Sequence, residues 1–256
     1  MGWVLVLGVS SGFGAAAARA FAAAGYDVAG VHLDRRAGQL AADALAEEIR
    51  GMGRQAVFFN VNAADDERRA ETIAALKAAI PAGGLRVLLH SLAFGSLLPY
   101  VSAEGKVASR KQMEMTVDVM GHSLVYWTQD LVTSGLFGPG RVFAMTSAGS
   151  HMVWKGYGMV SAAKAAMEAH VRQLAVELAP YGITANAILA GVTKTAALEK
   201  IPGHEALVSG ALARNPYRRL TTPEDVANCL VELARPGTAW MNGNVIRVDG
   251  GEDCSG

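Results

Sequence analysis

Two ionisable side chains, Tyr157 and Lys164, stand seven positions apart in a stretch that is expected to be helical. At ~100° per residue, seven steps bring both side chains to within ~20° of one helix face, ~10 Å apart along the axis. A phenol can donate a hydrogen bond to a developing enolate or alkoxide oxygen, and a nearby cation favours negative charge there. The pair suits hydride-transfer chemistry, whereas taken alone it would more often be a packed aromatic and a solvated lysine.

A glycine-rich loop, with glycines at Gly8, Gly12 and Gly14, joins the first apolar run to an alanine-rich stretch. Glycines let the backbone approach a pyrophosphate, and a helix start offers free N–H groups to its charge. Residues 8–12 also match G-x-S-x-G, in which Ser10 would be a hydrolase nucleophile. A nucleophile elbow normally follows earlier strands, so its place on the first strand disfavours that interpretation. A purely structural turn is the other alternative.

The elements that must position these residues alternate along the chain in a βαβ rhythm. Continuously apolar strands indicate a parallel sheet that is covered on both faces. We predict an α/β, doubly wound (Rossmann) fold, with residues 1–256 as a single domain and a mobile-looking lid at about 196–216. The seven expected strands are 3–7, 27–33, 56–59, 86–90, 141–146, 183–189 and 244–248.

Composition narrows the class of protein. Hydrophobic residues make up 51% of the chain and charged residues 18%, which is typical of a well-packed globular domain. Lys plus Arg (23) equals Asp plus Glu (23), so nucleic acid and anionic membranes are disfavoured as partners. The short run Trp3 to Leu7 is neither a membrane span nor a signal peptide, so we expect a cytoplasmic protein. Cys229 and Cys254 match no metal or redox spacing, and neither a disulfide nor a metal site is expected.

The motifs together resemble the short-chain dehydrogenase/reductase family. The resemblance rests on the glycine loop, the Tyr157/Lys164 helix and the run Val248-Asp249-Gly250-Gly251, and it extends over essentially the whole chain. It implies a seven-stranded nucleotide-binding domain, hydride transfer to or from a nicotinamide, Lys164 on the nicotinamide ribose, and a homotetramer.

The spacing of the pair points to one branch of that family. Most members place the lysine four positions after the tyrosine, whereas Tyr-x6-Lys resembles the enoyl-[acyl-carrier-protein] reductases. The segments His90 to Gly95 and Ala190 to Thr195 are similar to that branch, with Val192 where proline is usual. The resemblance implies NAD(P)H-dependent reduction of the C2–C3 double bond of an enoyl thioester in fatty acid or related acyl biosynthesis. Acyl carrier protein is then an expected partner, and coenzyme A is the other carrier left open.

Two positions bear on the alternatives. Met120 stands where ketoreductases carry a catalytic asparagine, and methionine cannot support a proton-relay water, which disfavours a ketoreductase or alcohol dehydrogenase. Ser147 stands where the branch usually has a first tyrosine, and Thr146 aligns with the family serine. Which of Ser147 and Thr146 contacts substrate is left open, as is a non-catalytic nucleotide-sensing role.

The cofactor residues follow from the same resemblance. An acid at the end of the second strand would bind the ribose 2′-OH of NADH, but Asp34 lies two residues later than that acid usually does, and Arg35 and Arg36 follow it, which favours NADPH. Asn60 and Val61 would contact adenine, and Thr195 the nicotinamide carboxamide. The expected cofactor-binding residues are Gly8, Ser10, Ser11, Gly12, Phe13, Gly14, Asp34, Arg35, Asn60, Val61, Ser91, Leu92, Ala93, Lys164, Gly191, Val192, Thr193 and Thr195.

Substrate residues are expected around the lid. The stretch from Ala196 to Asn215 lies where the family covers its acyl chain, and its small apolar residues and glycines fit a segment that orders over an apolar ligand. An ordinary structural loop is the alternative. Phe94, Trp154 and Met159 are candidates for lining the acyl pocket.

Overall fold

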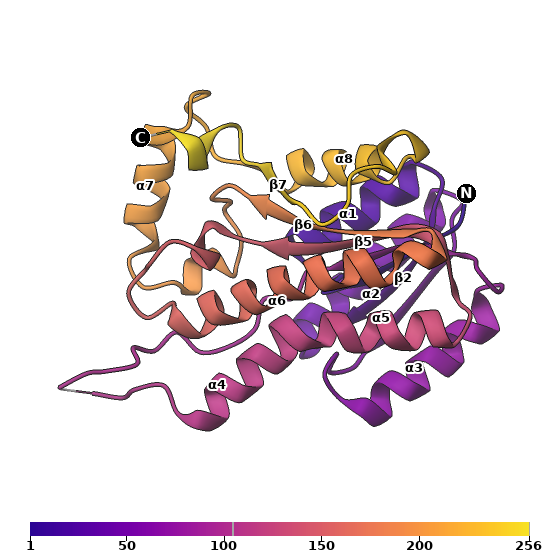
Figure 1. Cartoon of the computed structure of the whole chain (residues 1–256), viewed down its shortest axis with the longest axis horizontal. Coiled ribbons are helices and arrows are strands. Elements are labelled where there is room, and N and C mark those ends of the chain that lie inside the picture. The colour runs from indigo at the N-terminus through magenta and orange to yellow at the C-terminus, as the bar shows by residue number, and fades with distance from the viewer. Residues whose placement is uncertain (104, 256) are drawn as a thin grey trace.

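The computed structural model describes residues 1–103 and 105–255 as one layered α/β domain (Figure 1). Seven parallel strands form one sheet in the order β3-β2-β1-β4-β5-β6-β7, which confirms the predicted doubly wound fold. The strands are β1 (Trp3–Leu7), β2 (Asp27–His32), β3 (Ala56–Asn60), β4 (Leu85–His90), β5 (Phe137–Thr146), β6 (Ile183–Ala190) and β7 (Val245–Val248).

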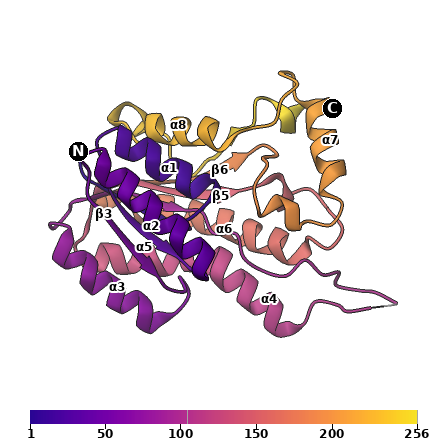
Figure 2. The same cartoon turned by 180° about the vertical axis from the view of Figure 1, so that it is seen from behind.

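Helices cover both faces of the sheet. In Figure 1 α5 and α6 lie in front of it, and from behind, in Figure 2, α1 and α2 do. The helices are α1 (Gly12–Ala23), α2 (Arg36–Gly51), α3 (Asp66–Ala79), α4 (Arg110–Val117), α5 (Ser123–Thr133), α6 (Gly158–Glu177), α7 (His204–Arg214) and α8 (Pro223–Leu233).

The continuous apolar strand β1 explains why two cores form. Successive side chains of a strand point to opposite faces, so Trp3, Leu5 and Leu7 pack under α3, α5 and α6. Val4 and Val6 pack under α1, α2 and α8. All five side chains are buried, as a strand between two helical layers requires.

The alanine-rich helix α1 packs unusually close to its neighbours. Ala15, Ala16, Ala17 and Ala18 are all buried, and α1 lies against both the sheet and α8. Small side chains permit this approach, and alanine has the highest helix propensity. The close packing fixes the start of α1 against the end of β1.

The order of the strands creates the crevice in which the site lies. The chain passes from β1 outward to β2 and β3, then returns to place β4 on the other side of β1. At such a switch point the loops after the two central strands diverge and leave a cleft at their carboxyl ends. The glycine loop follows β1, and the segment from Ser91 follows β4, so both border that cleft.

Three further segments lie outside the regular alternation of strands and helices. The mobile-looking stretch at 196–216 contains a short 3₁₀ turn, η4 (Leu198–Lys200), and the regular helix α7. A π-helical turn, η1 (Asp118–His122), interrupts the long helix between α4 and α5. The connection between β4 and α4 projects from the body of the molecule (Figure 1). Its flanks are joined by a hydrogen bond from the Ala108 N–H to the Pro99 carbonyl, at 2.9 Å.

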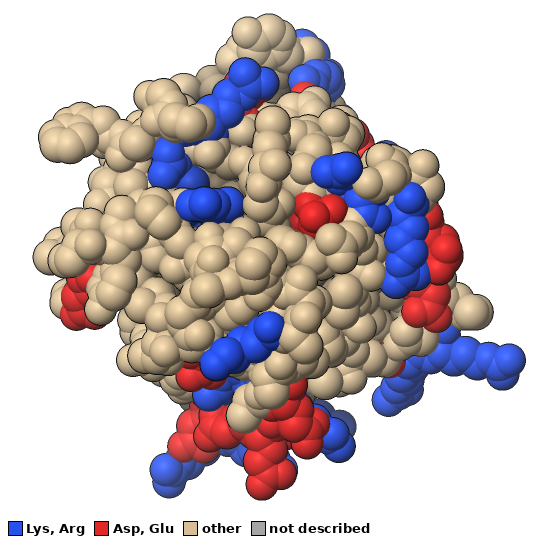
Figure 3. Space-filling view, turned by 90° about the vertical axis from the view of Figure 1, so that its right-hand side faces the viewer, with Lys and Arg blue, Asp and Glu red and all other residues tan. Residues whose placement is uncertain are grey.

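The edge at which the strands begin is shown in Figure 3, where Lys and Arg atoms lie interspersed with Asp and Glu atoms among many uncharged ones. None of the described helices is long and apolar enough to span a bilayer. Within residues 1–103 and 105–255, no group of three or more His, Cys, Asp or Glu side chains is arranged to hold a metal ion.

Candidate active site

The glycine loop brings the backbone of β1 and α1 into close contact. Gly8 and Gly12 have φ of 92° and 53°, values that other residues rarely adopt. A Cβ on Gly14 would overlap the Gly8 carbonyl group, so only glycine allows the first turn of α1 to lie this close. Ser11 precedes the helix without capping it, which leaves first-turn N–H groups open to a ligand.

We expect Gly14→Ala to weaken cofactor binding and to lower the melting temperature. The added methyl group must push α1 away from Gly8, and overpacking of this kind costs about 1–3 kcal/mol. Isothermal titration with NADH or NADPH and a thermal melt would measure both effects. Gly51→Ala is the matched control, because a Cβ at Gly51 meets nothing within 4 Å. Equal behaviour of the two variants would contradict this account of the loop.

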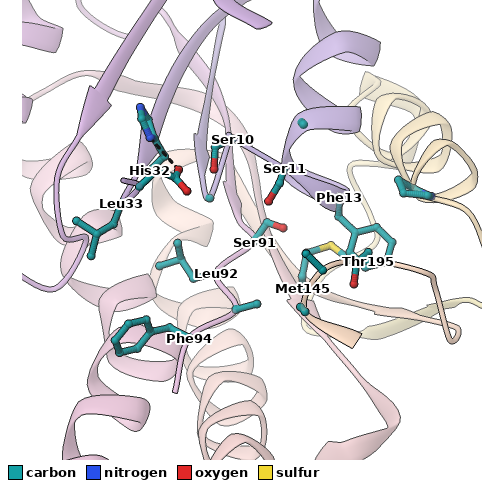
Figure 4. Close-up of a pocket in the computed structure, with 18 of the residues that line it drawn as sticks. Ser10, Ser11, Phe13, His32, Leu33, Ser91, Leu92, Phe94, Met145 and Thr195 are labelled. Carbon is teal, nitrogen blue, oxygen red and sulfur yellow. Dashed lines mark hydrogen bonds and ion pairs between the residues drawn. The ribbon is translucent and has the colours of Figure 1, made fainter. Parts of the chain in front are cut away.

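A cavity of about 800 Å³ extends from the glycine loop to Lys164 (Figure 4). In the close-up, Ser10, Ser11 and Ser91 lie near one another beside the loop. Most of the expected cofactor residues line this cavity: Gly8, Ser10, Ser11, Gly12, Phe13, Asp34, Val61, Ser91, Leu92, Ala93, Lys164 and Thr195. The lining does not include Gly14, Arg35, Asn60, Gly191, Val192 or Thr193.

Some of the expected residues that do not line the cavity support those that do. Asn60 accepts a hydrogen bond from the Asp34 N–H and donates one to the Asp34 carbonyl, both at 3.0 Å. The Asp34 carboxylate also lies 3.0 Å from the Nδ1 of buried His32. Asp34 is therefore held at the rim of the cavity by two neighbours. Thr193 is buried and donates a hydrogen bond to the Gly191 carbonyl at 3.0 Å.

Lys164 is buried at the opposite end of the cavity, with 6% of its surface exposed. Its Nζ donates to the Met145 carbonyl at 2.6 Å and lies 3.5 Å from the Leu92 carbonyl. Burial lowers the pKa of Lys164 to about 8, and the charge of Glu168 opposes this shift. The amine therefore loses its charge at a much lower pH than an exposed lysine.

Tyr157 occupies the position directly before α6 and packs against Met120, Val160 and Ala163. Burial raises the pKa of its phenol, so the hydroxyl stays protonated and able to donate at neutral pH. The nearby Ser147 hydroxyl partly opposes this rise. The phenol can therefore act as a hydrogen-bond donor beside the cavity.

The two candidates at the end of β5 differ in their partners. The Thr146 hydroxyl donates to Glu168 Oε1 at 2.5 Å. The buried Ser147 Oγ makes no hydrogen bond within the described residues. A Cβ placed on Gly149 would lie 2.5 Å from the Tyr157 ring and 3.2 Å from Ser147 Oγ, so the two side chains flank this glycine closely. Of the two hydroxyls, that of Ser147 thus lies beside the Tyr157 phenol, whose pKa it lowers.

Met120 lies in the π-helical turn η1 and is 2% exposed. Its side chain packs against Tyr157, where it supplies no group that could bind a water molecule. Turns of this kind interrupt helices most often at functional sites, and Val119 of the same turn lines the cavity. Nothing in the local sequence predicts this turn.

His90 supports the loop that follows β4. It is fully buried, and its Nε2 lies 2.9 Å from the Ser123 hydroxyl, which itself donates to the Val119 carbonyl. Burial and the positive charge of Lys164 lower the pKa of His90 to about 3, so the ring is neutral near pH 7. His90 was noted only as part of a motif, and its partners become visible only in the fold.

The three candidate substrate residues take different positions. Phe94 lines the cavity and is 40% exposed. Trp154 donates from its Nε1 to the Pro202 carbonyl at 3.2 Å, so it contacts the segment predicted to be a lid. Met159 is 1% exposed and is a core residue of α6. Residues of the lid segment that line the cavity are Ala196, Ala197 and Lys200.

Comparison with known proteins identifies the family to which this site belongs. The family model described as enoyl-(acyl carrier protein) reductase matches residues 8–252. The chain belongs to this family. It is therefore an oxidoreductase of the short-chain dehydrogenase/reductase superfamily that uses a nicotinamide cofactor, as the Tyr-x6-Lys spacing predicts.

Individual relatives agree with this assignment. The chain is 32% identical over 171 residues to an enoyl-[acyl-carrier-protein] reductase [NADH] of Aquifex aeolicus, covering 66% of this chain and 62% of the relative. It is 38% identical over 114 residues to 1-cyclohexenylcarbonyl-CoA reductase of Streptomyces collinus, covering 44% and 41%. The matched parts thus span less than two thirds of these relatives.

Solved structures extend the likeness over the whole fold. A crystal structure of the Aquifex aeolicus enoyl-[acyl-carrier-protein] reductase (NADH) superimposes with a TM-score of 0.86 at 25% identity, covering 100% of this chain and 97% of that one. The Bacillus cereus enoyl-acyl carrier protein reductase, solved with NADP⁺ and an indole naphthyridinone, gives 0.88 at 24% identity, with 100% and 97% covered. The latter likeness concerns the fold alone.

Proposed function

We propose that this protein reduces the C2–C3 double bond of an enoyl thioester with NAD(P)H. The observation that carries the proposal is the arrangement of a protonated, partly buried Tyr157 directly before α6 and a buried Lys164 on α6 that lines the cavity. The glycine loop and the uncapped start of α1 fit a dinucleotide pyrophosphate, and the cavity is continuous from there to Lys164.

Each residue has a defined part in the proposed reaction. When bound, the reduced nicotinamide supplies a hydride to C3 of the enoyl thioester. Tyr157 donates a hydrogen bond to the thioester oxygen, on which enolate charge develops, and C2 then takes a proton from solvent to give the saturated thioester. Lys164 holds the nicotinamide ribose and places a positive charge near that oxygen. Ser147, whose hydroxyl lies beside the phenol, assists Tyr157 at the position where a first tyrosine was expected.

The proposed substrate is an acyl thioester carried by acyl carrier protein or coenzyme A. The name of the Aquifex aeolicus relative includes acyl carrier protein, and the name of the Streptomyces collinus relative includes coenzyme A, so each supports one of the two carriers. For the oligomer we propose a homotetramer, as the family resemblance implies. The surface supports an assembly, because Trp240 is 99% exposed and Val245 on the edge strand β7 is 42% exposed.

The residues beside Tyr157 argue against the carbonyl alternative. A ketoreductase needs a polar group where Met120 packs, and the Thr146 hydroxyl is occupied by Glu168. For the hydrolase alternative, Ser10 would need a histidine, and no hydrogen bond joins Ser10 to a histidine or carboxylate in the described part of the chain. Ser10 instead borders the cavity beside the glycine loop.

Turnover separates these activities. The purified protein is incubated with NADH or NADPH and crotonoyl thioester, and separately with acetoacetyl thioester, while cofactor absorbance is followed. The proposal expects oxidation of the cofactor with crotonoyl thioester and little with acetoacetyl thioester. The reverse result would assign a ketoreductase, and no oxidation with any enoyl thioester would overturn the proposed activity.

Cofactor preference depends on the rim of the cavity. Arg35 and Arg36, which favour NADPH on sequence grounds, do not line the cavity, whereas the Asp34 carboxylate does. A carboxylate can accept from a ribose 2′-OH, and it repels a 2′-phosphate. We therefore propose NADH as the better cofactor. Arg19 also lines the cavity, but its guanidinium is engaged by Glu48 at 2.8 and 2.9 Å.

Replacing Asp34 by serine is expected to raise kcat/KM for NADPH about tenfold or more, because a like charge near the phosphate is removed. The efficiency with NADH should fall at the same time, because one acceptor for the ribose is lost. Asp43→Ser is the control, since Asp43 is exposed on α2 and binds Gln39 outside the cavity. Wild-type preference for NADPH, unchanged by Asp34→Ser, would contradict this prediction.

A further inference from the structure

Glu168 is a partly buried carboxylate that no step of the proposed reaction uses. It lies four residues after Lys164 on α6, so the two side chains share one helix face. Lys164 binds the Met145 carbonyl at 2.6 Å, and Glu168 accepts from the Thr146 hydroxyl at 2.5 Å. Two adjacent residues at the end of β5 are thus held by two side chains one helical turn apart.

The contacts of Lys164 with Met145 and of Glu168 with Thr146 fix the position of the backbone at the end of β5, directly before Ser147. Ser147 follows Thr146 directly and lies beside Tyr157, which belongs to the start of the same helix. A shift of α6 relative to β5 would therefore move Ser147 relative to Tyr157 and Lys164. The Glu168 contact is one of the links that set this geometry.

Glu168 also acts on Lys164 through its charge. Burial of the Lys164 amine favours its neutral form, and the carboxylate of Glu168 opposes that effect. Another titratable group that interacts with the amine is His90 from β4, whose ring is neutral near pH 7. Lys194, which precedes the lid segment, and Lys200, which belongs to it, also line the cavity.

We propose that Glu168 is a positioning residue, which lies one helical turn from Lys164 and, through Thr146, holds the end of β5 against α6. This inference rests on the proposed function for the role of Lys164 on the cofactor ribose. A purely structural Glu168 would affect stability alone. A positioning Glu168 affects the pH at which the cofactor is bound.

Cofactor binding across pH tests the proposal without any turnover. The dissociation constant of NADH is measured by fluorescence from pH 6 to pH 9.5 on the full-length wild type and on Glu168→Gln. In the wild type, binding should weaken as pH rises through about 8, where Lys164 loses its proton. In Glu168→Gln the same weakening should begin at a lower pH than in the wild type, because the charge that favours the protonated amine is gone.

A matched control comes from the same helix. Glu177 is exposed at the end of α6 and accepts a hydrogen bond from Gln173. Glu177→Gln should leave the pH dependence of NADH binding as in the wild type. If Glu168→Gln lowers the melting temperature but leaves that pH dependence unmoved, or if Glu177→Gln shifts it equally, the proposal is overturned.

Thr146→Val separates two effects of Glu168, namely its hydrogen bond with Thr146 and the effect of its charge on Lys164. This variant keeps the Glu168 carboxylate but removes its donor, so kcat should fall while the pH dependence of NADH binding stays near that of the wild type. Unchanged kcat in Thr146→Val would overturn the positioning role even if Glu168→Gln failed to fold. Failure of the proposed function would show separately, as no oxidation of NADH by the wild type with any enoyl thioester.

Discussion

Tyr157→Phe is expected to lower kcat about 10²- to 10³-fold while leaving NADH affinity nearly unchanged. The phenol hydroxyl is the donor nearest to the developing enolate in the proposed reaction, and loss of one such donor costs ~2.7–4 kcal/mol. Phenylalanine keeps the ring that packs against Met120, Val160 and Ala163, so the fold should be retained. Steady-state kinetics with crotonoyl thioester and a separate binding titration measure the two quantities.

Tyr181→Phe provides the comparison for this variant. Tyr181 is 56% exposed and lies after α6, in the short turn η3 (Ala179–Tyr181), so its hydroxyl should not affect turnover. A drop of less than about threefold in Tyr157→Phe, far below the usual effect of an oxyanion donor, would show that another group supplies the proton donor. Ser147 would then be the first residue to test, because its hydroxyl lies beside the phenol.

Lys164→Met is expected to lower kcat/KM about 10²-fold or more and to weaken NADH binding about tenfold. The variant loses a charged hydrogen-bond donor to the ribose, and charged hydrogen bonds contribute about 1.5–3 kcal/mol. It also loses the positive charge beside the reacting oxygen. Wild-type kcat/KM in Lys164→Met would contradict the role assigned to this residue.

The effect of Lys164→Met on the melting temperature should depend on pH, because the pKa of Lys164 is about 8 in the folded chain and 10.5 ordinarily. Between these pH values the unfolded chain binds the proton more readily, so the wild type becomes more stable as pH rises from 8. Below pH 8 the cost of burying the charge is fully present. Lys164→Met should therefore gain melting temperature relative to the wild type mainly near pH 7, and this gain should shrink towards pH 10.

Local periodicity accounts for what the sequence predicts well. The continuous apolar run of β1 requires burial on both faces, and this requirement alone implies helices above and below the sheet. The seven-residue spacing of Tyr157 and Lys164 predicts a shared helix face because the helical repeat is fixed, and in the structure α6 begins at Gly158, directly after Tyr157. The conformation of the loop is also predictable from its glycines, because Gly8 and Gly12 adopt positive φ, which other residues rarely adopt.

Features that depend on contacts between distant segments could not be predicted. Glu168 binds Thr146 across 22 positions, and Asn60 holds Asp34 across 26, so neither has a local pattern. The segment at 196–216 contains glycines that suggest mobility, but packing lets it form α7. Arg35 and Arg36 do not line the cavity, although they directly follow Asp34, which does.

Isotope transfer tests the central claim most directly. The wild-type protein is incubated with crotonoyl thioester and NADH that carries deuterium on both C4 positions of the nicotinamide, and the product is analysed by mass spectrometry and NMR. The account predicts a saturated butanoyl thioester with one deuterium at C3. A 3-hydroxy product, deuterium elsewhere in the chain, or no transfer at all would contradict the assignment of an enoyl thioester reductase.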